Sequence, residues 1–132
     1  MSTKKIVLLS VLFLLFTSLV FADNYQAYAS AINDKIEINE EAEFNITIKN
    51  NLNRTEEFRI RNLDFPVWDV RTVPLLNPFI ITVPPESQST FTVFVRSLNP
   101  SITPIGTYSV KARITKDNTD EFSDIPLTVA IK

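Results

Sequence analysis

The chain has 132 residues, 45% of them hydrophobic and 21% charged, which is the composition of one folded domain and not of a disordered tail. Histidine and cysteine are both absent from the sequence, which excludes serine–histidine triads, thiol nucleophiles, disulfides and the usual zinc sites. The formal net charge of −2 also argues against nucleic acid as a partner, since nucleic-acid binding requires clustered basic residues.

The first 22 residues have the layout of a secretory signal. Lys4 and Lys5 provide a basic start, an apolar run follows from Ile6 to Phe21, and Ala22 is a small residue of the kind that a signal peptidase reads. We therefore expect a signal helix over 1–22 that is cleaved after Ala22.

Cleavage leaves a mature domain over 23–132 that is secreted or held at the cell surface. Without Lys4 and Lys5 this domain carries 11 basic and 15 acidic residues, a net charge of −4, which also argues against an anionic membrane surface as a partner. The alternative is an uncleaved anchor with the domain outside the membrane. The 16 residues from Ile6 to Phe21 are only slightly fewer than the roughly 20 that span a bilayer.

Beyond the signal, apolar and polar residues alternate with a period of two, which predicts strands with one face in a core. The clearest alternation follows the turn at Pro84–Pro85, where Phe91, Val93 and Val95 share one face. In chain order, the expected strands cover 25–32, 35–38, 42–49, 56–62, 67–73, 79–83, 90–96, 107–115 and 123–132. The other residues expected to face the core are Phe44, Ile46, Ile48, Phe58, Ile60, Trp68, Val70, Phe79, Ile81, Val83, Tyr108, Val110, Ala112, Ile114, Ile125, Leu127, Val129 and Ile131.

The connections between these stretches contain asparagine and proline, and Gly106 is the only glycine. The Asn-Gly and Asp-Gly pairs that favour two-residue hairpins are absent, so longer connections are expected. The segment 98–105 contains two prolines and is expected to be a loop, without helix. Short strands with turn signals about every ten residues predict an all-β, Ig-like Greek-key β-sandwich of seven to nine strands.

Four segments of the chain have features that are also found in a known group of domains. Ile38–Asn50 is a strand end, an acidic turn and a strand that ends in asparagine, and Trp68–Val70 carries the single tryptophan. Val83–Val93 leads from a proline, acid and serine turn into a strand, and Ile105–Ala112 begins a strand with glycine, threonine and tyrosine. They resemble the alpha-galactosidase-associated Ig-like domain and the cell-adhesion-related (CARDB-like) domains of prokaryotic exported proteins.

The resemblance covers Asp34 to Ile131 and rests on core and turn positions. It departs from the pattern at Glu40–Glu41 and at Glu86, which stand where these modules usually have glycine. It implies a binding, adhesion or spacer module, an implication of fold that does not by itself define function.

Carboxylates are the only residues left for catalysis. Asp64 and Asp69 flank the tryptophan strand, and a carboxylate pair is the machinery of glycosidases. Both are more simply turn and surface acids, so we expect no enzymatic activity, no catalytic residue and no cofactor.

Oxygen ligands of the kind that calcium takes are concentrated near the C-terminus, at Asp117, Asn118, Asp120, Glu121 and Asp124. The spacing and central glycine of an EF-hand are missing. The segment is therefore interpreted as a solvated hairpin tip without metal, with calcium binding as the alternative.

Two N-glycosylation sequons begin at Asn45 and Asn53. Asn53 is expected in a loop, and Asn45 in a strand with its side chain outward. Tyr108 is either a corner tyrosine whose hydroxyl caps a loop or a core ring, and Trp68 is expected in the core instead of on a carbohydrate-stacking surface.

Phe94 is an apolar residue at an outward position of its strand. In an Ig-like order we expect this strand beside the one at 79–83, whose outward residue is Ile80. Phe94 and Ile80 are then predicted to form an exposed interaction patch, the alternative being two ordinary exposed apolar residues.

These observations predict a non-catalytic exported module that acts in cell-surface adhesion, in binding or as a spacer, with a protein or a cell-surface polysaccharide as its partner. One alternative is a membrane-anchored assembly subunit that keeps its N-terminal apolar helix. The other is an accessory domain of a carbohydrate-active enzyme system.

Overall fold

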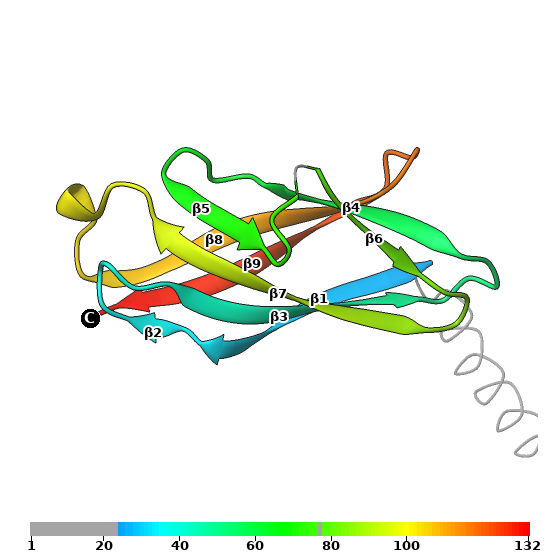
Figure 1. Ribbon diagram of the computed structural model, residues 1–132, viewed down its shortest axis with the longest axis horizontal. Helices are drawn as coiled ribbons and strands as arrows, with labels where there is room; N and C mark the ends of the chain where they lie inside the picture. Colours follow the sequence, from blue (N-terminus) through cyan, green and yellow to red (C-terminus); the bar gives the residue numbers. More distant parts are fainter. Residues whose placement is uncertain (1–23, 77) are drawn as a thin grey trace, which may run out of the picture.

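The computed structural model describes residues 24–76 and 78–132, so the predicted signal and its cleavage site lie outside the described residues. The described residues form nine strands in two sheets (Figure 1). The strands are β1 (Tyr25–Asn33), β2 (Lys35–Ile36), β3 (Ala42–Asn50), β4 (Glu56–Asn62), β5 (Trp68–Thr72), β6 (Phe79–Val83), β7 (Gln88–Ser97), β8 (Gly106–Lys116) and β9 (Phe122–Ile131). The predicted strand number and the predicted chain order are confirmed.

Two differences from the predicted elements have simple local causes. The expected strand over 35–38 is only the two residues of β2, because Glu40 N–H closes a turn on the carbonyl of Glu37 at 3.0 Å. The expected loop after β7 contains one 3₁₀ turn, Pro100–Ile102. Proline is tolerated there because the first N–H of a helical turn has no partner to lose.

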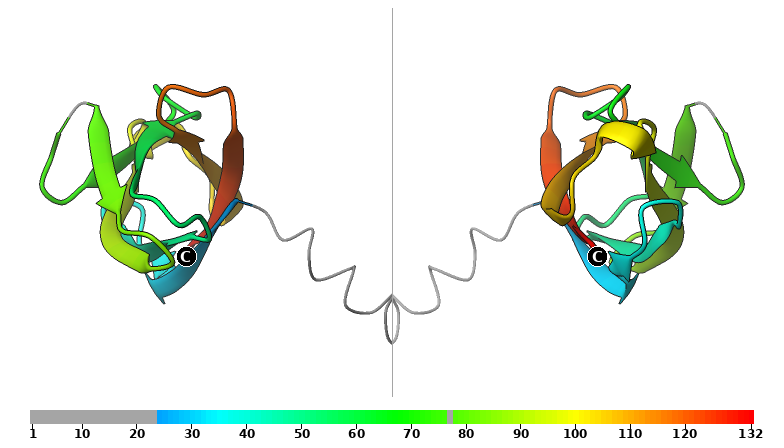
Figure 2. Two further views of the ribbon diagram at one scale, coloured as in Figure 1. Left: turned by 90° about the vertical axis from the view of Figure 1, so that its right-hand side faces the viewer. Right: turned by 90° about the vertical axis from the view of Figure 1, so that its left-hand side faces the viewer.

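The sheets have the strand orders β1-β3-β7-β5 and β2-β9-β8-β4-β6. All neighbours are antiparallel except β2, which pairs parallel to β9. Seen end-on, the two sheets face each other across the core (Figure 2). This is the arrangement of an Ig-like β-sandwich and confirms the predicted fold class.

The core consists of the inward residues of both sheets, as the period-two alternation predicts. Phe58, Ile46 and Leu127 are among its largest fully buried side chains. All the residues expected to face the core are buried, except that Val70, Ile81 and Tyr108 are partly buried and pack against it.

One side of the sandwich is closed by the chain itself. β1 pairs with β3 over most of its length, and β2 then joins the other sheet by pairing with β9. The backbone carbonyl of Asp34, between the two strands, accepts a hydrogen bond from Ala130 N–H at 2.7 Å. Ile36, two residues later, is fully buried. The consecutive strands β1 and β2 therefore link the two sheets along this side.

The end of β3 is held by a buried asparagine, Asn50. Its Nδ2 donates to the carbonyls of Arg54, Val83 and Pro84 at 2.8, 3.2 and 3.2 Å, and its Oδ1 accepts from Leu52 N–H at 3.0 Å. The side chain thus joins the loop after β3 to the turn after β6 and satisfies their backbone carbonyls, of which that of Val83 is buried.

Candidate functional site

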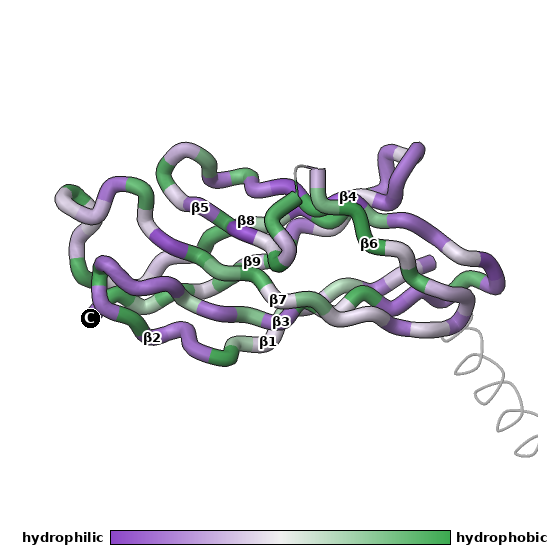
Figure 3. Tube along the Cα trace, viewed as in Figure 1, coloured by the Kyte–Doolittle hydropathy of each residue, from purple (hydrophilic) through white to green (hydrophobic). Residues whose placement is uncertain are grey.

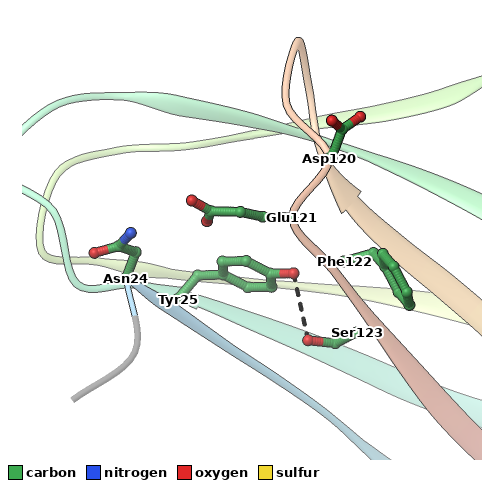
Figure 4. Close-up of a pocket in the computed structure, with 6 residues that line it drawn as sticks. All are labelled: Asn24, Tyr25, Asp120, Glu121, Phe122 and Ser123. Carbon is green, nitrogen blue, oxygen red and sulfur yellow. Dashed lines mark hydrogen bonds between the residues drawn. The ribbon is translucent and has the colours of Figure 1, made fainter. Parts of the chain in front are cut away.

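An open hollow of about 520 Å³ lies beside the start of β1, between Asn24–Tyr25 and Asp120–Ser123 (Figure 4). Ser123 Oγ donates to Tyr25 Oη at 3.3 Å. The carboxylates of Asp120 and Glu121 point in different directions and do not converge on one point (Figure 4). The arrangement is that of a solvated polar surface.

The remaining acids expected for calcium are paired with arginines. Asp117 lies 3.5 Å from Arg59, and Asp124 accepts from Arg113 Nε and Nη2 at 2.7 and 3.1 Å. The Arg113 hydrogen bonds hold the pKa of Asp124 below its usual range. In residues 24–76 and 78–132, no group of three or more acidic side chains is placed to hold a metal ion.

The other acids singled out in the sequence stabilise local structure. Asp64 caps the chain before β5: its carbonyl accepts from the N–H groups of Val67 and Trp68 at 2.9 Å, and its Oδ2 accepts from Lys111 N–H at 2.6 Å. Asp69 faces Arg96, with Oδ2 3.5 Å from Nε. Each of the two acids thus has its own partner.

The two sequon asparagines differ in accessibility. Asn53 is exposed in the loop after β3, as predicted. Asn45 is half-buried on β3, and its Oδ1 accepts from Thr92 Oγ1 on β7 at 2.9 Å. Asn53 is therefore the more accessible acceptor.

Both aromatic residues singled out around β5 and β8 have structural positions. Trp68 is only 6% exposed and its ring centroid lies 5.3 Å from that of Tyr108, so the predicted core position is confirmed. Tyr108 Oη donates to the carbonyl of Pro104 at 2.6 Å, which confirms the corner-tyrosine interpretation.

The predicted patch of Phe94 and Ile80 is wrong in its strand pairing. β7 lies between β3 and β5 in one sheet, whereas β6 is at the edge of the other sheet and pairs with β4. The two residues therefore stand on different sheets. Phe94 is half-buried and has the Arg71 guanidinium over its ring, 4.9 Å from the centroid, and Ile80 is 39% exposed.

The side opposite the β1–β2 link is open. Here the sheet edges are β5 and β6, and among the described residues neither has a strand on its outer side. A groove of about 440 Å³ lies between them, with walls from β4, β5 and β6 and from the connections around Phe65 and Leu75. We call it the open-side groove, and define it by Ile60, Arg61, Phe65, Val70, Thr72, Leu75, Leu76 and Phe79.

Large exposed apolar side chains occur in the connections that flank β5, and three of them, Phe65, Leu75 and Leu76, line this groove. Between β4 and β6, five of them are exposed to solvent. Their exposed fractions are 69% for Phe65, 53% for Val67, 49% for Val73, 72% for Leu75 and 53% for Leu76. Figure 3 shows apolar residues along the segment that leads from β5 into β6, and this connection projects from the sandwich in Figure 2.

Two charged side chains line the groove, Arg61 and Asp69, and Asp69 lies 3.5 Å from Arg96. Five of the six arginines pair with a carboxylate, from Arg54–Glu56 to Arg113–Asp124. Arg61, exposed on the groove wall, is the one arginine for which the described residues supply no such pair. The groove thus combines an apolar surface with an unpaired positive charge.

Sequence reasoning missed this groove. Its exposed apolar residues, Phe65, Leu75 and Leu76, lie in the two connections that flank β5, where no alternation assigns a face. The available signal was composition: Phe65, Val67, Val73, Leu75 and Leu76 fall within twelve positions beside Pro66, Pro74 and Pro78. Loop segments lie on the surface, so apolar loop residues are the ones that remain exposed.

Comparisons with known proteins show the fold. No family model and no curated protein matches the chain. A FixG-related protein from Vibrio parahaemolyticus is 9% identical with a TM-score of 0.66, over 84% of this chain and 99% of that one. The cupredoxin domain of amoB from Nitrosocaldus yellowstonii is 6% identical with a TM-score of 0.60, over 84% and 88%.

A third solved structure, Salmonella alpha-2-macroglobulin, is 14% identical with a TM-score of 0.61, and the match covers 83% of this chain and 7% of that one. The chain is thus an Ig-like β-sandwich domain, similar in fold to these β-sandwich structures. The described residues also contain no helix with the length and apolar content needed to cross a membrane.

Proposed function

We propose that this protein is an exported, non-catalytic Ig-like module that binds a protein partner through the open-side groove. The observation that carries the proposal is that three exposed apolar side chains, Phe65, Leu75 and Leu76, line one groove of about 440 Å³. Scattered exposed apolar residues are ordinary, whereas a contiguous apolar patch is typical of an interaction surface.

A protein partner is favoured over a polysaccharide by the side chains available. The single tryptophan, the ring considered for carbohydrate stacking, is buried and packed against Tyr108. The exposed ring that lines the groove, Phe65, lines it together with two exposed leucines, Leu75 and Leu76. The groove instead offers Leu75, Leu76 and Phe65, which match apolar side chains of another protein. This also gives the predicted adhesion or spacer role a physical basis, since a module that joins proteins needs such a surface.

The location of the module is part of the proposal. Lys4, Lys5 and the apolar run to Phe21 support export with cleavage after Ala22. N-terminal sequencing of the exported protein tests this: a chain beginning at Asp23 supports a secreted or surface module. A chain that keeps residues 6–21 makes it a membrane-anchored subunit with the same groove outside. Membership of the CARDB-like or alpha-galactosidase-associated families remains part of this proposal and rests on the four sequence segments alone.

The binding proposal is tested by a double substitution, Phe65→Ser with Leu75→Ser, in the exported protein. Affinity capture from a cell-surface extract is expected to lose the specific partner, while the melting temperature stays close to that of the wild type because both side chains are exposed. The matched control is Ile102→Ser with Ile105→Ser, whose side chains are 75% and 79% exposed outside the groove. Equal capture by all three proteins would rule out the groove as the binding site.

A further inference from the structure

One wall of the open-side groove is the outer edge of β5, with which no strand of the described residues pairs. Val67 C=O accepts from Leu98 N–H at 3.0 Å, toward β7. Trp68 faces the other way: its N–H donates to Asp64 C=O at 2.9 Å, and its C=O accepts from Asn62 Nδ2 at 2.7 Å. Local groups therefore satisfy Trp68 on the side away from β7.

The same alternation continues along β5. In an antiparallel pair, successive residues direct their N–H and C=O groups alternately toward and away from the partner strand. Asp69 and Arg71 thus bond to β7, while Val70 and Thr72 direct their backbone groups away from it. Both residues line the groove, and no strand of the described residues pairs with this edge. The free edge and the apolar groove occupy the same place.

We propose that the partner enters the open-side groove as an extended peptide segment that adds a strand to β5, with apolar side chains in the groove and an acidic side chain at Arg61. This rests on the proposed function and specifies the occupant of the same site. Strand addition joins backbone hydrogen bonds, which give affinity, to pockets for alternate side chains, which give specificity.

Three features of the site favour this occupant over others. Backbone donors and acceptors at Val70 and Thr72 require an extended backbone opposite them, which a helix cannot offer. The apolar residues Phe65, Leu75 and Leu76 require an apolar segment. The unpaired charge of Arg61 is complementary to a carboxylate in a protein otherwise rich in paired arginines.

The short length of β5 makes the interaction selective. β5 has five residues and is bounded by Pro66 before it and Pro74 after it. Proline and short length limit edge-to-edge pairing between sheets. Only a segment whose side chains also fit the groove gains enough contacts, so nonspecific strand pairing is weak.

The experiment is a selection of binders from a displayed library of random peptides about eight residues long, on the mature protein. Selected peptides are expected to alternate apolar residues and to contain aspartate or glutamate. The best peptide is then synthesised with single N-methyl groups along its backbone, which remove one N–H donor each and keep the side chains. Methylation at alternate positions is expected to weaken binding about tenfold or more, and methylation between them to have little effect.

The charge contact is tested by Arg61→Gln, which is expected to weaken binding of the acidic peptide by about three- to tenfold. The loss should disappear for the same peptide with its carboxylate changed to the amide. Arg59→Gln is the matched control, because Arg59 is exposed on the same strand but does not line the groove.

The outcomes separate the two proposals. If Phe65→Ser with Leu75→Ser abolishes binding but the N-methyl scan shows no alternation, strand addition is overturned and the groove remains the binding site. If the double substitution leaves peptide binding unchanged, the groove is not the binding site and the proposed function is overturned. If the free protein forms a dimer that the selected peptide dissociates, the occupant is a second copy of this chain, which overturns the proposed foreign segment.

Discussion

The two sides of this sandwich differ in whether the chain joins the edges of the two sheets. On the closed side, β1 and β2 run from one sheet to the other, and Ile36 is buried where the chain crosses. On the open side, β5 and β6 end their sheets without a partner strand among the described residues, and apolar side chains such as Leu75 stay exposed.

The difference separates stability from binding. Buried apolar residues on the closed side contribute to folding, because their surface is removed from water in the folded chain. The exposed apolar residues on the open side contribute little to folding, because they remain in water in the folded chain. Their burial would instead contribute to the free energy of binding a partner. The edge strands β5 and β6 are short and bounded by prolines, which protects them from indiscriminate pairing.

The largest expected effect comes from opening the closed side. Ile36→Ala is expected to lower the free energy of unfolding by about 2–4 kcal/mol, because it leaves a cavity at a fully buried position. Leu75→Ser, on the open side, is expected to change it by about 0.5 kcal/mol or less. Urea unfolding of both variants measures the contrast, and equal losses would contradict the separation of stability from binding.

A smaller effect is expected at Asn50, which ties the end of the open-side strand β6 to the other sheet. Asn50→Ala removes the donor from the carbonyls of Val83 and Pro84 and is expected to cost about 1–3 kcal/mol. Asn53→Ala, in the exposed loop, is the control and is expected to be near neutral. Hydrogen exchange should rise in β6 more than in β9, and a uniform rise would show that Asn50 does not act locally.

The smallest expected effect is a pH dependence of stability that comes from Arg113 and Asp124. This pair lies on β8 and β9, away from the open and the closed side of the sandwich. The Arg113 hydrogen bond lowers the pKa of Asp124 in the folded state. The stabilisation is therefore present at neutral pH and is lost as the pH falls through the folded pKa. Asp124→Asn should lower the melting temperature slightly at neutral pH, and the difference from wild type should shrink as the pH falls below the usual pKa range of a carboxyl group.

The control for this measurement is Asp120→Asn at the hairpin tip, where no described lysine or arginine forms an ion pair with the carboxylate. Its difference from wild type is expected to be smaller at neutral pH. A constant difference between wild type and Asp124→Asn from neutral to acidic pH would contradict a role for the charged pair.

The sequence by itself determined the fold class and the inward face of the long strands after β1. Alternation with a period of two is a local property, so Phe44, Val110 and Leu127 could be assigned to the core without knowing their partners. The corner-tyrosine role of Tyr108 could also be proposed from the sequence, because its hydrogen bond to the carbonyl of Pro104 spans only four residues.

Only the tertiary structure decided which strands became edges and where apolar surface was left uncovered. Phe94 and Ile80 were predicted on neighbouring strands, yet the chain places β6 and β7 in different sheets. Strand order depends on contacts between distant segments, which the alternation within one segment does not encode. The open-side groove exists for the same reason: Arg61, Val70 and Leu75 are brought together by the path of the chain between the sheets.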